Sequence, residues 1–275
     1  MDSKVYTDRL AVAGRKLGRT LTHMVGDPDG VYAGIKSHYP NPHTRANFIN
    51  AFWVHVKKLT TLPPATRDRW AAIFAETCAV NSAIYESNTP NDRQASGMVP
   101  HAAILATRDA LPYGSPQRLL LGMYTYIDPL RNDFHALEVF SAPPNMPPTG
   151  NYIVLGTTNQ LIVQQYKTAK TYKTLIIPLP RPLVQELGLS LQLSPRRHVF
   201  VMKNGQPYTK ESSFSAWANH QLKTLLKNEH ITLTMLRHIY ITEHTQGMTL
   251  AERKQTARNM GHSVMMQLGY ALSSV

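Results

Sequence analysis

The sequence predicts two domains: an all-α N-terminal domain over residues 1–96, and a mostly helical α+β domain over residues 97–275 with one small antiparallel sheet. Three observations lead to this fold class. A chain of 275 residues is long enough for two separate hydrophobic cores. Apolar residues recur at helical spacing through most of the chain, whereas runs typical of strands gather between residues 152 and 208. The segment ESNTPNDRQASGMVP (86–100) is polar and turn-rich, so we place the linker there, from about residue 86.

The N-terminal domain is expected to consist of helices alone. Residues 3–24 carry apolar side chains at helical spacing, and the turn-forming segment GDPDG (26–30) ends this helix. Thr44 is a suitable N-cap for a second helix that runs to about residue 59. After the helix-breaking LPPAT, a third helix is expected over residues 67–85.

The second domain is expected to open with helices, continue through a small sheet and return to helices. Apolar runs over residues 152–155, 161–168 and 173–180 predict a three-stranded antiparallel meander. Residues 198–208 predict a further short extended piece with an Asn-Gly turn. The helices are expected over residues 101–111, 115–127, 210–227, 233–246, 249–260 and 264–272.

Both halves of the chain are basic, which indicates an anionic partner. The net charge is +12; residues 1–100 hold 12 Lys/Arg against 8 Asp/Glu, and residues 101–275 hold 17 against 9. Nucleic acid is the first candidate partner and an anionic membrane surface is the second, while a charge that serves solubility alone is the remaining explanation. Binding to nucleic acid should weaken steeply with salt.

The chain shows no signal segment and no stretch that approaches membrane-spanning length, so we expect an intracellular protein. The single cysteine, Cys78, excludes a disulfide framework and a cysteine-based metal site. Cys78 lies in an apolar helical pattern and is expected to be a small core residue.

The C-terminal stretch from Thr234 to Val275 holds the first group of candidate catalytic residues. Arg237 offers a planar charge suited to phosphate oxygens. His262, in the turn Gly261-His262-Ser263, can share a proton, and the Tyr270 hydroxyl can act as a covalent nucleophile. Each of these residues alone would more often be structural, but together in a basic chain they suggest a tyrosine that attacks DNA.

Two further candidates precede this stretch. Arg131 lies in DPLRND at the end of an apolar helix, where Asp133 could orient it by hydrogen bonding. Lys167 lies in the expected strand of QQYKTAKTYK, at the end of a hairpin that could reach a duplex, with Lys170 and Lys173 as rivals.

Other basic residues are candidates for contacts with the DNA backbone. In the helix over residues 44–59 these are Arg45, Lys57 and Lys58, and in the hairpin Lys170 and Lys173 could serve in the same way. A solvated helix face explains the first three equally well.

In this order the candidates resemble the tyrosine recombinase/integrase family. The family's first arginine, hairpin lysine, second arginine, Gly-His histidine and tyrosine nucleophile are matched by Arg131, Lys167, Arg237, His262 and Tyr270. LRHIYIT is similar to the family's Leu-Arg-His helix, and MGHS to its Leu-Gly-His-Ser turn. The match spans about residues 101–275, and the helical part before it is similar in kind to the family's core-binding domain. DPLRND and HSVMMQLGYAL look similar to recombinases from eukaryotic mobile elements and large DNA viruses.

The resemblance implies a site-specific recombinase or integrase that cleaves and rejoins DNA without a metal or a nucleotide cofactor. Tyr270 would attack a DNA phosphate, forming a 3′-phosphotyrosyl link and releasing a 5′-hydroxyl. Arg131 and Arg237 would hold the non-bridging oxygens, Lys167 would protonate the leaving oxygen, and His262 would donate a hydrogen bond to the phosphate. The implied partners are double-stranded DNA and further copies of the chain, as a dimer or tetramer. The implied location is on DNA inside the cell: the nucleus if the host is eukaryotic or viral, otherwise the cytoplasm or nucleoid.

The chain departs from the family pattern at several positions. Thr234 stands where the His-x-x-Arg histidine is expected, so His262 and the charge of the arginines should carry more of the deprotonation of Tyr270. His238 follows Arg237 directly and is expected to point elsewhere on its helix, in a structural role. Asp133 lies one position closer to Arg131 than in the common bacterial pattern, and His262 and Tyr270 are also one residue closer together. Only five residues follow Tyr270, so exchange of a C-terminal tail between protomers is absent or the chain has been cut.

Two other functions fit the same sequence. A type IB topoisomerase would use the same chemistry as a monomer, although the small N-terminal domain favours a recombinase. A DNA-binding module that has lost catalysis is the second alternative, and the replacement of histidine by Thr234 favours it.

Overall fold

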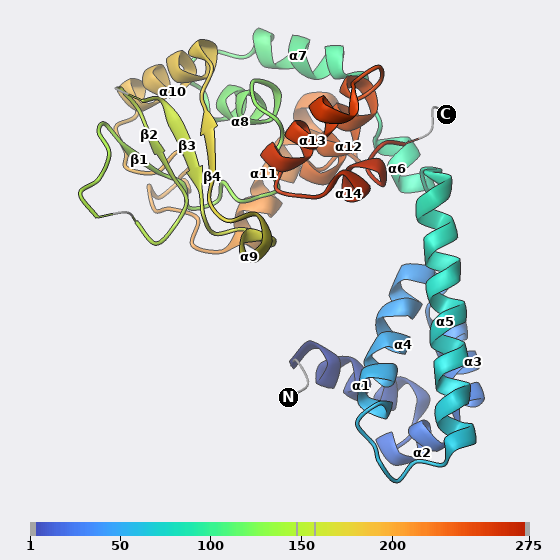
Figure 1. Cartoon of the computed structure of the whole chain (residues 1–275). Helices are drawn as coiled ribbons and strands as arrows, with labels where there is room; N and C mark the ends of the chain where they lie inside the picture. Colours follow the sequence, from blue (N-terminus) through green and yellow to red (C-terminus); the bar gives the residue numbers. More distant parts are fainter. Residues whose placement is uncertain (1–3, 147, 157, 273–275) are drawn as a thin grey trace. The chain divides into compact units, whose positions relative to one another are not determined.

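The computed structural model describes residues 4–146, 148–156 and 158–272, and the chain divides into two compact units, Met1–Ser87 and Asn88–Val275 (Figure 1). The division falls within the segment 86–100 that the sequence marks as the linker. The second part of that segment forms a short helix, α6 (Asp92–Gly97), which belongs to the second unit.

The described residues of the first unit are all helical or irregular. Its helices are α1 (Lys4–Leu17), α2 (Leu21–Gly26), α3 (Pro28–His38), α4 (Pro42–Val56) and α5 (Pro64–Ser87). The core is built on Phe52 and Trp70, whose rings stack at 4.9 Å, and the Trp70 indole nitrogen donates to the Val25 carbonyl at 2.9 Å. That hydrogen bond satisfies the one polar atom of a fully buried tryptophan.

Three expectations for this unit are wrong in detail. The helix expected over residues 3–24 is two helices, because Gly18 adopts a positive φ of 64° between α1 and α2. Thr44 is not the N-cap of α4; Asn41 caps this helix and Pro42 occupies its first turn, where a missing N–H costs nothing. Cys78 is exposed, because it lies on the outer side of α5 and not among the residues that face the core.

The second unit is mostly helical with one small sheet, as the sequence predicts. Figure 1 shows the strands grouped at one end of this unit and α12, α13 and α14 at the other. Its helices after α6 are α7 (His101–Ala110), α8 (Pro116–Thr125), α9 (Ala169–Tyr172), α10 (Arg181–Leu193), α11 (Glu211–Leu226), α12 (Leu233–His244), α13 (Leu250–Asn259) and α14 (Val264–Leu268). The short α6 and α9 and the longer α10 are absent from the sequence-based expectation.

The sheet has four strands in the order β1-β2-β3-β4 and is mixed. The strands β2 (Tyr152–Val154), β3 (Gln160–Val163) and β4 (Leu175–Pro178) form the expected antiparallel meander. The additional strand β1 (Glu138–Phe140) pairs with β2 in parallel, so the sheet is not purely antiparallel. Residues 198–208 contribute two isolated bridges, His198 to Glu138 and Val201 to Pro207, in place of a continuous strand.

No helix in the described ranges is both long and apolar enough to cross a bilayer.

Candidate active site

The second unit contains two adjoining cavities that share Arg131, Asn132 and Lys167. The first, of about 510 Å³, is lined by four of the five residues singled out as catalytic from the sequence, together with Thr234. Its lining is Arg131, Asn132, Lys167, Ser215, Asn219, Leu233, Thr234, Arg237, Met266 and Tyr270. The second, of about 390 Å³, adds Asp133, His135, Tyr166 and Glu211 to the shared residues.

The N-terminal turns of α12 present Arg237 to the first cavity. Thr232 caps this helix by accepting from the Met235 N–H, and the Asn219 side chain accepts from the Leu233 N–H at 2.9 Å. Thr234 and Arg237 are three residues apart and therefore lie on one face of the helix. The positive end of the helix dipole and the arginine charge act in the same part of the cavity.

Arg237 is a buried cation. Its side chain is 2% exposed, and within the described ranges neither its Nε nor either Nη makes a hydrogen bond. Burial lowers the pKa of Arg237, but an arginine remains protonated near neutral pH. Its guanidinium carbon lies 5.0 Å from the Tyr270 ring centroid, so the ring face partly offsets the unpaired charge.

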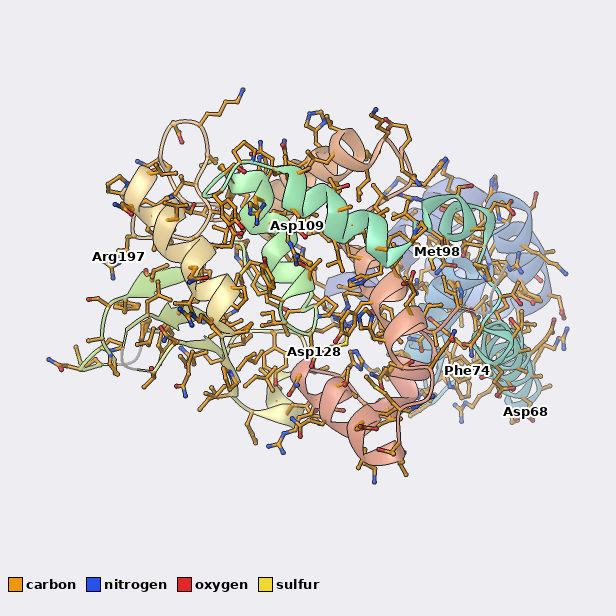
Figure 2. All side chains as sticks on the ribbon, turned by 90° about the horizontal axis from the view of Figure 1, so that it is seen from above. Asp68, Phe74, Met98, Asp109, Asp128 and Arg197 are labelled. Atoms are coloured by element: carbon orange, nitrogen blue, oxygen red, sulfur yellow. The ribbon has the colours of Figure 1, made fainter. Side chains whose placement is uncertain are left out.

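Arg131 lies in a loop after α8 that is anchored at several points. Asp128 accepts from the Tyr240 hydroxyl of α12 and, at 2.7 Å, from the Asn259 amide of α13; Figure 2 labels Asp128 beside these helices. The Tyr124 hydroxyl of α8 donates to the Arg131 carbonyl at 2.7 Å. The expectation that Arg131 lies at the end of a helix is wrong, because α8 ends at Thr125. The loop is nevertheless anchored to α8 on one side and to α12 and α13 on the other.

Asn151 joins the Arg131 loop to the lysine loop. Its amide nitrogen donates to the carbonyls of Asp133 and Gln165, at 3.0 and 2.9 Å, and its oxygen accepts from the backbone N–H groups of Gln164 and Gln165. The side chain is 7% exposed, so these bonds are shielded from water. One asparagine thus fixes the spacing between the segments that carry Arg131 and Lys167.

Lys167 lies in the loop between β3 and α9, not in a strand, because β3 ends at Val163. Thr168 donates to the Gly261 carbonyl, and the Tyr166 ring packs on Gly261, where a Cβ atom would come within 2.9 Å of it. The loop is therefore seated on the Gly-His turn. Lys170 and Lys173 lie on α9 and at its C-cap, are exposed, and line neither cavity as far as the structure describes them.

The Gly-His turn is the C-terminal cap of α13. The Gly261 N–H donates to the Arg258 carbonyl and the His262 N–H to the Ala257 carbonyl, both at 3.0 Å, which is a Schellman motif. Gly261 has a φ of 67°, a left-handed conformation that glycine adopts without strain. The motif turns the chain so that the next side chain, His262, is buried beside Tyr270.

His262 is a neutral imidazole with one free nitrogen. It is 2% exposed; burial, together with the charges of Arg237 and Arg131, lowers its pKa to about 4, while the hydrogen bond to the Ser263 backbone acts in the opposite direction. Its Nδ1 lies 3.1 Å from the Ser263 carbonyl, so the proton of the neutral ring is on Nδ1. Nε2 is buried without a partner among the described residues and is an acceptor.

The Tyr270 ring contacts two histidine rings. Its ring stacks on the His262 ring with centroids 5.6 Å apart, and the His238 ring is 4.7 Å away. His238 Nδ1 is 2.9 Å from the Tyr270 carbonyl, and the Thr242 hydroxyl accepts from the Leu272 N–H at 3.0 Å. Among the described residues that line the cavity His238 does not appear; its hydrogen bond is with the backbone of the tyrosine.

Asp133 does not form the expected hydrogen bond with the Arg131 side chain in the part of the chain that the structure describes. Burial raises its pKa to about 6, while the charges of Arg237 and Arg131 act in the opposite direction. Asp133 lines the second cavity, so the orientation of Arg131 depends on the backbone anchors described above.

The three basic residues proposed on the helix over residues 44–59 differ in their surroundings. Arg45 donates to the Pro40 carbonyl at 2.7 Å and so closes the loop before α4. Lys57 lies 5.5 Å from the Trp53 ring centroid and is exposed, as is Lys58.

Sequence reasoning does not identify Tyr124, Asp128 or Asn151, because each acts through a partner that is distant in sequence or on the backbone. Across the described ranges, no group of three His, Cys, Asp or Glu side chains is suited to hold a metal ion.

No protein-family model matches the chain, and no curated protein matches it. Among solved structures, the crystal structure of XerA recombinase aligns with 98% of this chain and 86% of its own, with 14% sequence identity and a TM-score of 0.45. A likeness this distant carries no weight for the activity, which has to be argued from the site.

Proposed function

We propose that the chain is a DNA strand transferase of the tyrosine recombinase type, which acts through a 3′-phosphotyrosyl intermediate. One observation carries the proposal: the buried guanidinium of Arg237 has no acceptor among the described residues and borders a cavity together with Arg131, Lys167 and Tyr270. A phosphodiester suits this set, because it offers two non-bridging oxygens to the guanidinium groups and an electrophilic phosphorus to the phenol.

The energetics of the buried charge support an anionic ligand. Transfer of an unpaired cation from water into a protein interior costs several kcal/mol. An unpaired Arg237 therefore destabilises the fold, and its burial is not explained by stability. A bound phosphate would supply the missing acceptors and the opposite charge at once. The basic composition of the chain would add a long-range attraction to DNA.

In the proposed reaction the Tyr270 phenol oxygen attacks phosphorus, and the bond from phosphorus to the 5′-oxygen breaks. Arg131 and Arg237 stabilise the charge that grows on the non-bridging oxygens. The Lys167 ammonium gives its proton to the leaving oxygen, so that a 5′-hydroxyl departs. Attack of a 5′-hydroxyl on the phosphotyrosyl link reverses these steps and rejoins the strand, with no net change in the number of phosphodiester bonds.

The state of His262 supports a role as the acceptor of the phenol proton. Thr234 offers only a hydroxyl, which is no base at neutral pH. His262 has a free acceptor at Nε2 and a ring stacked on Tyr270. The sequence-based expectation that His262 donates a hydrogen bond to phosphate applies only after this proton has been taken up. A bound phosphate would raise the pKa of His262, because it opposes the charge of the two arginines.

Within this proposal the strand transfer serves recombination or integration at a specific DNA site. The partner is double-stranded DNA, with further copies of the chain assembled on it, and the protein works where that DNA is held inside the cell. Relaxation of supercoils by a single copy would use the same residues and would be distinguished by its product.

The test is a nicked suicide duplex that carries the cognate site. We expect the protein to form a denaturant-stable adduct with the DNA, and we expect Tyr270→Phe to abolish it. Tyr113→Phe is a matched control, because Tyr113 is 64% exposed and phenylalanine keeps the ring on which the Arg118 guanidinium packs. An undiminished adduct in Tyr270→Phe would refute the nucleophile, and the absence of any adduct with the unaltered protein would favour a binding module without catalysis.

A further inference from the structure

The main chain of Tyr270 is held by the helix that carries Arg237, and we propose that His238 is a positioning residue for Tyr270 whose tautomer is set by Gln94 of α6. This inference rests on the proposed function, since it concerns the same nucleophile. His238 touches neither cavity in the described part of the chain, so it would act through the tyrosine and not on the phosphate.

The contact between His238 and Tyr270 is short and buried. The side chain is 7% exposed, Nδ1 is 2.9 Å from the Tyr270 carbonyl oxygen, and the ring centroids are 4.7 Å apart. One turn further along α12, Thr242 accepts from the Leu272 N–H. His238 and Thr242 are four residues apart on one helix face, so together they bind the backbone at two points around Tyr270.

The second histidine nitrogen faces Gln94. Gln94 is the third residue of α6 and completes a capping box with Asn91: its Oε1 accepts from the Asn91 N–H at 3.0 Å. That bond leaves the Gln94 amide nitrogen, a donor only, 3.5 Å from His238 Nε2.

These contacts select one tautomer of His238. Nε2 must accept from the Gln94 amide, so the ring proton is on Nδ1, from which it donates to the Tyr270 carbonyl. The opposite tautomer would set two donors against each other at Gln94 and two acceptors at Tyr270. Burial lowers the pKa of His238, which keeps the ring neutral and the choice between the two tautomers meaningful.

The helix α6 is itself held by other parts of the second unit. The Asn228 amide donates to the Ser96 carbonyl at 2.8 Å. A Cβ atom on Gly97 would lie 2.9 Å from the His230 carbonyl oxygen, so the two backbones are in close contact. Gln94 is therefore presented to His238 by a fixed element and not by a free chain.

The consequence for the proposed reaction is geometric. Arg237 and His238 are adjacent on α12. The helix that would bind the phosphate therefore also fixes the distance between the phosphate and Tyr270. A displacement of about 1 Å in a reacting group can lower a rate about 100-fold. Loss of the His238 contact should slow the attack while leaving the binding of DNA intact.

The first measurement is the single-turnover rate of adduct formation on the suicide duplex, with DNA affinity measured in parallel. His238→Leu should lower the rate by about 10- to 100-fold, with DNA affinity within about twofold. His238→Asn should recover most of the rate, because an amide can donate to the same carbonyl. Gln94→Leu should give an intermediate loss, and His220→Leu, at an exposed histidine of α11, should have no effect. A rate within about twofold of normal in both His238→Leu and Gln94→Leu would overturn the proposal.

The second measurement needs no DNA and so separates this inference from the proposed function. Nitrogen NMR of ¹⁵N-histidine-labelled full-length protein should show His238 with its proton on Nδ1, and Gln94→Leu should relax this preference towards a mixture. The signal should persist in Tyr270→Phe, because the acceptor is the backbone carbonyl. A proton on Nε2 in the unaltered protein would overturn the inference even if the DNA adduct forms. Conversely, if His238 carries its proton on Nδ1 but no protein–DNA adduct forms, the proposed function is contradicted and this inference is not.

Discussion

Arg237 and Arg118 are both buried arginines, but their surroundings are opposite. Arg118 is 3% exposed and pairs with Glu186, and it also donates to the carbonyls of Arg108, Asp109 and Leu111. Arg237 has no such partner among the described residues. Protein contacts explain the burial of the first arginine, whereas the burial of the second is explained by the anionic ligand that we propose.

This contrast predicts opposite effects of the same substitution on stability. Arg237→Met should raise the free energy of unfolding of the DNA-free protein by about 1–3 kcal/mol, because it removes an uncompensated buried charge. Arg118→Met should lower it by about 3–5 kcal/mol, because Glu186 is left unpaired. Denaturant unfolding of both variants measures the difference. A similar loss of stability in Arg237→Met would show that the arginine has a structural partner.

At the scale of elements, the turn between α13 and α14 connects three parts of the site. It caps α13, it presents His262, and it receives the loop that carries Lys167. Gly261 permits all three, since its φ is positive and its α-carbon lies against the Tyr166 ring. The absence of a side chain at Gly261 is therefore required both for the backbone conformation of the turn and for the contact with Tyr166.

Gly261→Ala should lower the free energy of unfolding by about 1–3 kcal/mol, since alanine is strained at this φ and its methyl group would displace Tyr166. The rate of adduct formation should fall as well, because Lys167 moves with that loop. Gly188→Ala is the matched control: Gly188 is exposed in α10 with nothing near the added carbon, so a gain of up to about 1 kcal/mol is expected. Equal stability of the two variants would contradict the role given to the turn.

The elements that the sequence predicts are those with a strong local pattern. The helices α11, α12 and α13 are confirmed within two residues, and the meander β2-β3-β4 is confirmed in its order, although β3 ends earlier than predicted. The start of α3 is hidden by Asp27 and Pro28, which indicate a turn and a helix start equally well. The run over residues 161–168 predicts a strand that includes Lys167, whereas β3 ends at Val163 and the following loop contacts Gly261.

The sequence predicts the candidate catalytic residues but not the residues that hold them in position. Arg131, Lys167, Arg237 and Tyr270 line one cavity, yet the roles given to them stay a prediction. Asn151 and Gln94 were not foreseen, because an amide side chain shows no pattern that distinguishes a buried link from a surface residue. Their partners are fixed only when distant segments fold together.

For the molecule as a whole, His262 and Asp133 make opposite contributions to the dependence of stability on pH. Between about pH 6.5 and 4 the unfolded chain protonates His262 while the folded protein does not, so this residue destabilises the fold as the pH falls. Between about pH 4 and 6 the folded protein keeps a proton on Asp133 that the unfolded chain has lost, so this residue destabilises the fold as the pH rises.

Single variants separate the two contributions. The stability of the unaltered protein relative to His262→Gln should increase as the pH rises from about 4 to 7, and its stability relative to Asp133→Asn should decrease over about pH 4 to 6. Denaturant unfolding across this range measures both differences, and all other titrating groups cancel in them. A pH-independent difference for His262→Gln would mean that its imidazole is not shielded from water.

The helix α12 carries both Arg237 and His238, which contacts the backbone of Tyr270 in the same polypeptide. In the proposed reaction, each copy on the DNA uses its own Tyr270 to cut the strand whose phosphate is bound by its own Arg237. A mixture of two inactive variants, one without the Arg237 guanidinium and one without the Tyr270 hydroxyl, would not regain activity. Neither variant would contain a complete set of catalytic residues. Cutting would then follow the number of intact chains, however many copies assemble around the DNA.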